Sequence, residues 1–327
     1  MYKICYVLVD SGSLKYLNQL LISLKTVRNY MPRKQICVVI DDKTKANLTE
    51  KNNYISIIEK YSEVKEVEIA QEFSYKERSR YLKTNLRSLV EGDFLFLDTD
   101  TICCCEFPEK ISECDIAMVH DSHIENLTYD AFVHEITNVF GDKLPILSKK
   151  YEYFNSGVMW VKDTEKAKKF FGDWNKNWLI SLKNGINRDQ PSLNFCNEKN
   201  DNIISKLDDV WNVQINAIKF PIQYTTKALV IHYFNMSNSV YDIRMKNNNS
   251  DIWEIENWED IVTKPRELFV PGFYVGQDSE IGEIMSSKQF EVIKSLYFFH
   301  RKIYEKNEKI LNKISNIRKR KVKTDLQ

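Results

Sequence analysis

Short apolar runs alternate with segments of helical periodicity along the first 235 residues of this 327-residue chain. The runs at residues 2–9, 35–40 and 94–97 are almost continuously apolar, which is typical of strands buried on both faces of a sheet. Leucines at helical spacing from Leu14 predict a helix that ends at Met31-Pro32. Strands that alternate with helices predict an α/β fold with a mostly parallel central sheet flanked by helices.

The same patterns predict the other elements of this part of the chain. Strands are expected at residues 64–69, 115–120, 158–161 and 228–234, and helices at residues 74–91 and 166–182 and from Leu193. Asn155-Ser156-Gly157 precedes one of these strands. We expect it to be polar and flexible, so that the backbone approaches a ligand closely, although a plain turn is the alternative.

Two acids, Asp98 and Asp100, follow the apolar run at residues 94–97 and enclose Thr99. Residues two apart in an extended segment point the same way, so both carboxylates can converge on one hard cation such as Mg²⁺ or Mn²⁺. Asp10 and Asp41 follow other predicted strands, and parallel strands end at a shared edge. The pattern indicates a ligand site at that edge, while two solvated acids in a loop remain the alternative.

The helix before the central strand carries a capping-box pattern at Ser74 and Glu77 and a row of basic residues. A crossover helix begins at the edge where the strands end, so Arg78, Arg80 and Lys83 are expected near Asp98. There they can pair with a diphosphate, whereas a solvated basic face is the other interpretation.

Two further positions have both a chemical and a structural interpretation. Asp189-Gln190 precedes a short helix, where it either lines the site or only caps the helix. His232 ends an apolar strand and is either a third ligand for Mn²⁺ or a packed core histidine.

Composition indicates the class of protein and its cellular compartment. With 43% hydrophobic and 28% charged residues, the chain is globular, and it has neither an apolar run long enough to span a membrane nor a signal-peptide pattern. Its seven cysteines show no zinc spacing, and reduced thiols are expected, with Cys103 to Cys105 continuing a buried strand or turn. These features predict a cytoplasmic protein.

The C-terminal part differs from the rest. Residues 236–283 predict irregular structure that covers the core, and residues 284–327 predict a basic amphipathic helix and tail. From Lys288 to Lys323, 12 Lys and Arg against three Glu give a charge of +9, although the whole chain carries only +1. The helix binds either an anionic membrane surface or the protein itself. Nucleic acid is not expected, because the body is acidic and lacks a recognition motif.

Taken together, these blocks resemble the GT-A-fold glycosyltransferases, most nearly glycosyltransferase family 8 and its bacterial relatives. The resemblance covers residues 1–235 and rests on the opening strand, the helix with Arg78 and Arg80, Phe96-Leu97-Asp98-Thr99-Asp100, Phe154-Asn155-Ser156-Gly157-Val158-Met159, Asp189-Gln190-Pro191-Ser192-Leu193-Asn194, Trp211-Asn212 and Ile231-His232-Tyr233. One difference is the absence of the Lys-Pro-Trp element that commonly follows the late His in that family.

The resemblance implies a site and a reaction. Asp98, Asp100 and His232 would bind Mn²⁺ (or Mg²⁺), which bridges the diphosphate of a nucleotide sugar. The resemblance also implies that Val9, Asp10 and Ser11 contact the nucleotide, that Arg80 approaches the donor, and that Asn155, Asp189 and Gln190 are catalytic positions facing sugar and acceptor. Arg78, Lys83 and Thr99 are further candidates for binding the donor.

The implied function is metal-dependent transfer of a sugar from a nucleoside diphosphate, with UDP expected, to a glycan, lipid-linked or protein acceptor. Retention of configuration, a role in surface polysaccharide biosynthesis and a peripheral position on the inner face of the membrane are expected. Two alternatives remain open. One is a haloacid-dehalogenase-like phosphatase with Asp98 as nucleophile, and the other is a non-catalytic relative that binds sugar nucleotides.

Overall fold

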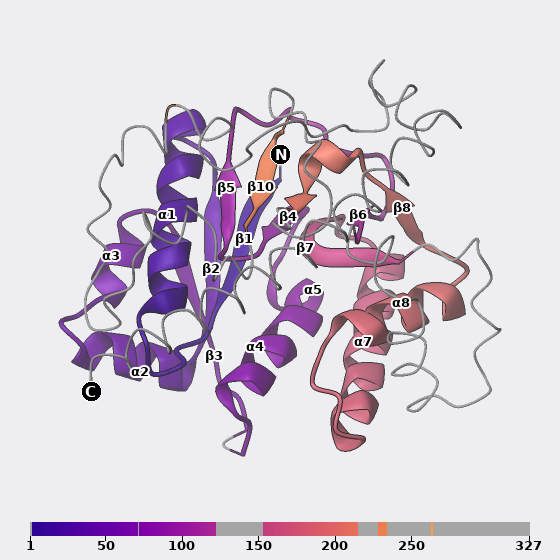
Figure 1. Cartoon of the computed structure of the whole chain (residues 1–327), viewed down its shortest axis with the longest axis horizontal. Coiled ribbons are helices and arrows are strands. Elements are labelled where there is room, and N and C mark those ends of the chain that lie inside the picture. Colours follow the sequence, from indigo (N-terminus) through magenta and orange to yellow (C-terminus); the bar gives the residue numbers. More distant parts are fainter. Residues whose placement is uncertain (1, 71, 122–152, 215–227, 234–262, 264–327) are drawn as a thin grey trace, which may run out of the picture. The chain divides into compact units, whose positions relative to one another are not determined.

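The computed structural model describes residues 2–70, 72–121, 153–214, 228–233 and 263 (Figure 1). Contacts divide the chain into two units, residues 1–276 and 277–327, and every described residue belongs to the first. The predicted basic C-terminal helix and nearly all of the predicted covering segment, residues 236–283, lie outside the described residues. The division into residues 1–235, 236–283 and 284–327 therefore stays a prediction.

Helices and strands alternate through the described part of the chain as the hydrophobic pattern predicts. In order they are β1 (Lys3–Leu8), α1 (Lys15–Tyr30), β2 (Ile36–Asp41), α2 (Asp42–Glu50), α3 (Ile55–Glu59), β3 (Glu63–Val67), α4 (Tyr75–Thr84), α5 (Leu86–Leu89), β4 (Phe94–Leu97), β5 (Thr101–Cys103), β6 (Ile116–His120), β7 (Phe154–Val161), α7 (Glu165–Lys183), α8 (Gln190–Lys199), β8 (Ile204–Lys206), the 3₁₀ turn η2 (Asp209–Trp211), β9 (Val213–Gln214) and β10 (Val230–His232).

Seven strands form the main sheet in the order β3-β2-β1-β4-β7-β6-β8. β1 pairs in parallel with β2 on one side and with β4 on the other. β7 is antiparallel to both of its neighbours, so the other strands of this sheet all run in one direction. The predicted α/β fold with a mostly parallel sheet is confirmed.

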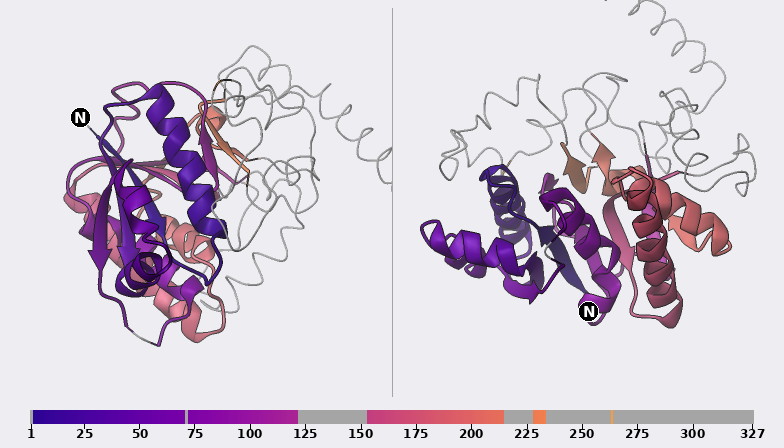
Figure 2. Two further views of the ribbon diagram at one scale, coloured as in Figure 1. Left: turned by 90° about the vertical axis from the view of Figure 1, so that its left-hand side faces the viewer. Right: turned by 90° about the horizontal axis from the view of Figure 1, so that it is seen from below.

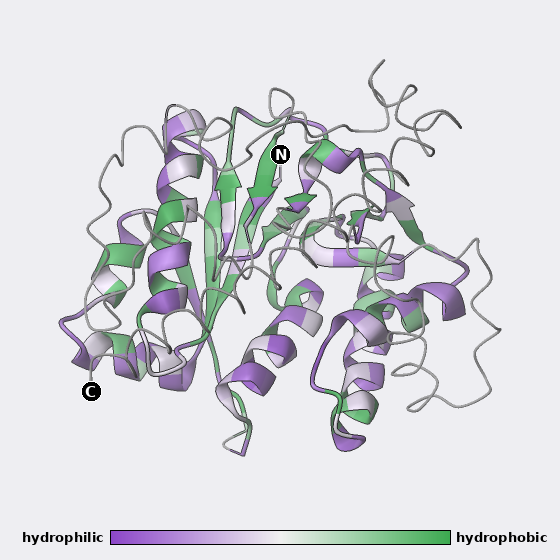
Figure 3. Ribbon diagram, in the orientation of Figure 1, coloured by the Kyte–Doolittle hydropathy of each residue, from purple (hydrophilic) through white to green (hydrophobic). Residues whose placement is uncertain are grey.

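The two faces of the sheet bury different sets of side chains. In β1, Ile4, Tyr6 and Leu8 pack in the core that includes α1, whereas Cys5 and Val7 belong to the core that includes α4, α5, α7 and α8. The strands are coloured as hydrophobic in Figure 3, and Figure 2 shows α1 and α7 on opposite sides of the strands. Alternate residues of a strand point to opposite faces, so a central strand must be apolar throughout.

A second, three-stranded sheet has the order β5-β10-β9. β5 begins directly after Asp100, and β10 pairs with it in antiparallel register, with His232 opposite Thr101. The backbone N–H of Tyr233 donates to the carbonyl oxygen of Asp100 at 3.1 Å. This pairing brings a residue from near the end of the described chain beside the two acids that follow β4.

Several local features of the structure differ from the predictions or add to them. The helix expected at residues 74–91 is interrupted at Asn85, between α4 and α5. The polar segment Asn155-Ser156-Gly157 was expected to be flexible but is part of β7. There the carbonyl oxygen of Gly157 accepts a hydrogen bond from the backbone N–H of Asp98. Cys103 and Cys104 are buried as predicted, and all seven cysteines lie in the described residues without a disulfide.

Among the helices that the structure describes, none combines the length and the apolar composition needed to cross a membrane.

The capping box at the start of α4 provides a stability test. Both of its hydrogen bonds are present, between Ser74 and Glu77. We expect Ser74→Ala to lower the free energy of unfolding by about 1 kcal/mol, because an N–H of the first turn loses its acceptor. Urea unfolding measures this loss. Ser88→Ala, which removes an exposed hydroxyl bonded to the carbonyl of Asn85, is the control. Equal effects of both variants would contradict the role of the cap.

Candidate active site

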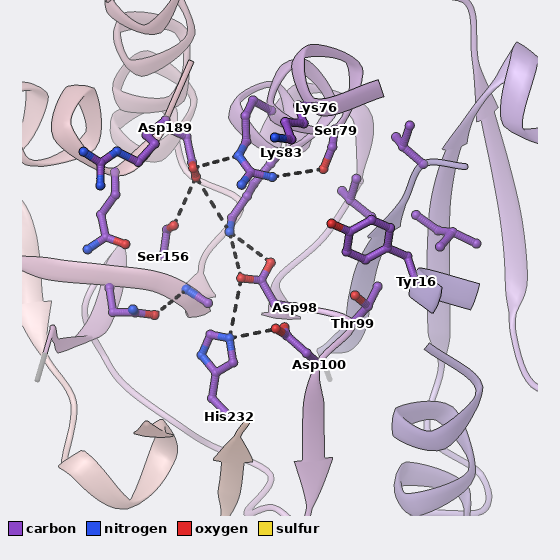
Figure 4. Close-up of a pocket in the computed structure, with 18 of the residues that line it drawn as sticks. Tyr16, Lys76, Ser79, Lys83, Asp98, Thr99, Asp100, Ser156, Asp189 and His232 are labelled. Carbon is purple, nitrogen blue, oxygen red and sulfur yellow. Dashed lines mark hydrogen bonds and ion pairs between the residues drawn. The ribbon is translucent and has the colours of Figure 1, made fainter. Parts of the chain in front are cut away.

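A cavity of about 660 Å³ opens where β1, β4 and β6 end, on the carboxyl side of the parallel strands (Figure 4). Its lining combines acids, bases and amides from elements far apart in the sequence. The principal groups are Val7–Val9 at the end of β1, Tyr16 of α1, Lys76, Arg80 and Lys83 of α4, Asp98–Asp100 after β4, Asp121 after β6, Asn155–Gly157 of β7, Asp189–Pro191 at the start of α8 and His232 of β10.

Asp98, Asp100 and His232 form the centre of the cavity. One ligand atom from each side chain lies within 4.8 Å of the others, and Nε2 of His232 is 3.2 Å from Asp100 and 4.0 Å from Asp98. Backbone hydrogen bonds hold both acids, since Asp98 N–H donates to the carbonyl oxygen of Gly157 at 2.8 Å and the carbonyl oxygen of Asp100 accepts from Tyr233 N–H at 3.1 Å. Two carboxylates and an imidazole at this spacing fit a single divalent cation such as Mn²⁺ or Mg²⁺.

The two acids ionise differently although they lie side by side. Although 30% of the Asp98 side chain is exposed to the cavity, desolvation raises its pKa, against the opposing effect of Lys83. Burial also opposes the ionisation of Asp100, but His232 and hydrogen bonds to the carboxylate outweigh it, and the pKa of Asp100 is lowered. The surroundings therefore favour the ionised form of Asp100 and oppose that of Asp98.

Lys83 links the metal-ligand acids to a third acid. Its Nζ lies 2.9 and 3.1 Å from the oxygens of Asp98 and 3.7 Å from Asp189, and its side chain is only 6% exposed. The ammonium also lies 5.0 Å from the centre of the Phe96 ring. For Lys83, the interpretation of a solvated basic face is therefore wrong. It is a buried cation at the centre of the site.

Asp189 is the N-cap residue of α8, but its side chain makes no capping hydrogen bond, so capping alone does not account for this residue. Its carboxylate accepts a hydrogen bond from Ser156 Oγ at 3.1 Å and lies 3.1 Å from Nε of Arg80. Burial would raise the pKa of Asp189, but Lys83 and Arg80 outweigh this effect and lower it. In return, Asp189 raises the pKa of Arg80. Asp189 is thus an ionised carboxylate held between two cations.

Other predicted site residues lie elsewhere. Val9 and Thr99 line the cavity, but its described lining does not include Asp10, Ser11 or Arg78. Asp10 accepts hydrogen bonds from Gly12 N–H at 3.0 Å and from the Asn47 amide at 2.9 Å.

Arg78 has a structural role at the end of β2. It forms a buried ion pair with Asp41 and donates to the carbonyl oxygen of Asp10 at 3.3 Å, so it joins the ends of β1 and β2. This position departs from the prediction that Arg78 lies near Asp98.

Gln190 and Asn155 do line the cavity, and both side chains donate to the carboxylate of Asp121. His120, at the end of β6, packs on Phe154 with ring centres 4.9 Å apart.

Some lining residues were not predicted from sequence: Tyr16, Tyr75, Ser79 and Arg188. Tyr16 carries a weak signal in its sequence position, since it lies in the first turn of the helix that follows β1.

A mostly parallel sheet whose strand ends carry clustered acids, an imidazole and buried cations is the arrangement expected of a GT-A glycosyltransferase. Comparison with protein families agrees: the profile of the nucleotide-diphospho-sugar transferases matches residues 33–270. The chain belongs to this family. It is therefore a transferase, and the match does not support the phosphatase with Asp98 as nucleophile.

Solved structures with a related fold include mouse xyloside xylosyltransferase 1 in its apo form, which is 12% identical with a TM-score of 0.47 over 73% of this chain and 99% of that one. The galactosyltransferase LgtC, in complex with donor and acceptor sugar analogs, is 13% identical with a TM-score of 0.48 over 80% and 95% of the two chains. The glycosyltransferase GlyE of Streptococcus pneumoniae TIGR4 is 18% identical with a TM-score of 0.43 over 92% and 65%. A comparison with curated protein sequences gives no match.

The position of Arg78 leads to a prediction about stability. We expect Arg78→Leu to lower the free energy of unfolding by about 3–5 kcal/mol, because Asp41 would remain buried without its cation. Chemical denaturation measures this change. Lys45→Gln, which breaks an exposed ion pair with Glu66, is the control and should have little effect. An Arg78→Leu variant as stable as the wild type would show that this ion pair does not hold the two strand ends together.

Proposed function

We propose that the protein is a metal-dependent glycosyltransferase that moves a sugar from a UDP-linked donor to an acceptor hydroxyl with retention of configuration. The observation that carries this proposal is the cluster of Asp98, Asp100 and His232 beside two cations, at the carboxyl edge of the sheet. Family membership supports the nucleotide-sugar donor. Metal, base and stereochemistry are the parts that we infer, and retention rests on the resemblance to glycosyltransferase family 8.

Asp98, Asp100 and His232 are the residues that would hold the divalent cation. Bound there, the ion would supply a Lewis acid for the diphosphate oxygens. Carboxylate oxygens and a neutral imidazole suit Mn²⁺ and, with less preference for the imidazole, Mg²⁺.

Lys83 and Arg80 provide the positive charge that the chain itself brings to the donor. As the bond between the anomeric carbon and the diphosphate breaks, its electron pair leaves with the diphosphate, and preorganised cations stabilise the charge that develops there. Both residues line the cavity, and Asp189 holds them in place. We assign to them the contact with the diphosphate that the Lys-Pro-Trp element makes in the family that the sequence resembles.

Asp189, Gln190 and Asn155 lie on the side of the cavity that we assign to the sugar and the acceptor. The ionised carboxylate of Asp189 can stabilise the positive charge that develops at the anomeric carbon, as carboxylates do in glycoside hydrolysis. Gln190 and Asn155 are oriented by Asp121, which fixes their amides before substrate binds. We assign no covalent nucleophile among them.

We further propose that the acceptor is a glycan, a lipid-linked sugar or a protein, and that the enzyme builds a surface polysaccharide in the cytoplasm, at the inner face of the membrane. The support is the charge of +9 between Lys288 and Lys323, in a segment with helical spacing of apolar residues.

Calorimetric titration of nucleotides tests the donor and the metal together. UDP should bind in the presence of Mn²⁺ and not without it, and GDP and CMP should bind more weakly. Loss of a residue that only orients a metal ligand costs about 10–100-fold in affinity. Asp100→Ala removes a metal ligand itself, so its affinity for UDP should fall by more than this. Asp173→Ala, an exposed acid on α7, is the matched control.

No nucleotide binding under any of these conditions would contradict the proposed donor. Binding of UDP with Mn²⁺ but without consumption of any UDP-sugar, over a broad panel of acceptors, would instead indicate a relative that binds without turnover.

The role of Lys83 has a separate test. Lys83→Met should weaken the binding of UDP by about 10–100-fold, because a charge-assisted hydrogen bond to phosphate contributes about 1.5–3 kcal/mol. Uridine, which has no phosphate, should bind equally well to both proteins in a competition titration. Equal losses for uridine and UDP would show that Lys83 supports the nucleoside or the fold and not the diphosphate.

A further inference from the structure

The imidazole of His232 occupies the space that a side chain at position 157 would need. A Cβ atom on Gly157 would lie 2.2 Å from Cε1 and 2.5 Å from Nδ1 of His232, well below the 3.0 Å that real Cβ atoms keep. The φ angle of Gly157 is outside the left-handed region, so the backbone does not require glycine there. The need for glycine comes from the ring that packs against it.

A backbone group fixes the orientation of the neighbouring amide. The N–H of Gly157 is always a donor, and it points at Oδ1 of Asn155 at 2.8 Å. This atom must therefore be the oxygen of the Asn155 amide, which leaves its NH₂ group to donate to Asp121 Oδ2 at 3.2 Å. The amide of Asn155 has only this orientation because both of its ends face partners of fixed character.

The orientation passes through Asn212 to His232. Nδ2 of Asn212 lies 2.9 Å from the same oxygen of Asn155 and donates to it. Oδ1 of Asn212 then faces Nδ1 of His232 at 3.1 Å, and an oxygen there requires the proton of the ring on Nδ1. Nε2 is the atom that faces Asp100, at 3.2 Å, and it is the nitrogen that a cation shared with Asp98 and Asp100 would bind in place of a proton.

Burial keeps water from replacing these contacts. Asn155 is 6% exposed, Asn212 is 1% exposed and His232 is 4% exposed. An amide without its partner would therefore carry a desolvation cost, which strengthens the preference for a single arrangement.

We propose that Gly157, Asn155 and Asn212 are positioning residues that fix both the place and the tautomer of His232. Gly157 provides the space for the ring and the N–H that orients the amides, and Asn212 holds the proton on Nδ1. This inference deepens the proposed function, because it explains how His232 presents a lone pair to a cation shared with Asp98 and Asp100. Outer-shell partners of this kind set the tautomer of metal-binding histidines and raise affinity for the metal.

The first test reads the tautomer without metal. In the full chain labelled with ¹⁵N-histidine, two-bond ¹⁵N–¹H correlation spectra show from the ¹⁵N shift of Nδ1 whether that nitrogen carries a proton, independently of the state of Nε2 beside Asp100. The His232→Gln variant assigns the signal among the five histidines. Wild type should show Nδ1–H, and Asn212→Asp should keep it because a carboxylate also accepts that proton. Asn212→Leu should show Nε2–H or a mixture, with Mn²⁺ affinity reduced about 10–100-fold.

The second test uses a double-mutant cycle and needs no metal. Gly157→Ala should lower the melting temperature strongly in the wild-type background and much less in His232→Ala, where the ring is absent. The matched control is Gly172→Ala on α7, where a Cβ atom would meet nothing within 4 Å. If Gly157→Ala folds only in the His232→Ala background, the coupling is supported as well.

Three results would overturn the inference: an Nδ1 without a proton in the wild type, an unchanged Nδ1 signal and Mn²⁺ affinity in Asn212→Leu, or additive effects in the cycle. The proposed function fails separately. A wild type that binds no Mn²⁺ and no nucleotide would count against the transferase mechanism, while the tautomer and the cycle would still decide the role of Gly157, Asn155 and Asn212.

Discussion

Carboxylates enclosed by protein need positive charge close by, and this requirement organises the cavity. Lys83 lies between Asp98 and Asp189, Arg80 lies beside Asp189, and His232 faces Asp100. The compensating groups come from α4 and β10, so the packing of these elements and the charge of the site depend on each other. The same balance gives the cavity two kinds of affinity, for a cation at the paired acids and for an anionic group at the neighbouring bases.

The two sheets have different tasks in building the site. The main sheet brings the ends of β1, β4 and β6 to one edge, which requires only right-handed crossovers between neighbouring strands. The small sheet joins β5 to β10, whose positions in the sequence are more than a hundred residues apart. Contacts of such high separation close long loops, which costs chain entropy that the packing of the small sheet must offset.

Much of the fold was predictable because each central strand is apolar on both faces, as at Phe94–Leu97, and because Ser74 and Glu77 mark a helix start. The convergence of Asp98, Asp100 and His232 was also predicted, from strand ends and from family resemblance. The partners of individual side chains were not. Arg78 and Arg80 are two residues apart on one helix, so they point in different directions, and only tertiary packing decides which one meets Asp41 and which one meets Asp189. The Asn155–Asn212 contact joins residues without any shared sequence pattern, and its existence depends on the small sheet.

Helix α4 has Arg78 on a structural ion pair, Arg80 and Lys83 in the cavity, and Leu82 in the core. Each residue of an α-helix is rotated by about 100° from the one before it. The capping box fixes the residue at which the helix starts, and with it the direction in which each of these side chains points. Deletion of a single residue between Ser74 and Arg78 would place Lys83 at the core position of Leu82, and Tyr81 and Thr84 at the cavity positions of Arg80 and Lys83. A substitution along this helix therefore changes one contact, whereas a change in the number of residues in its first turn changes all of these contacts at once.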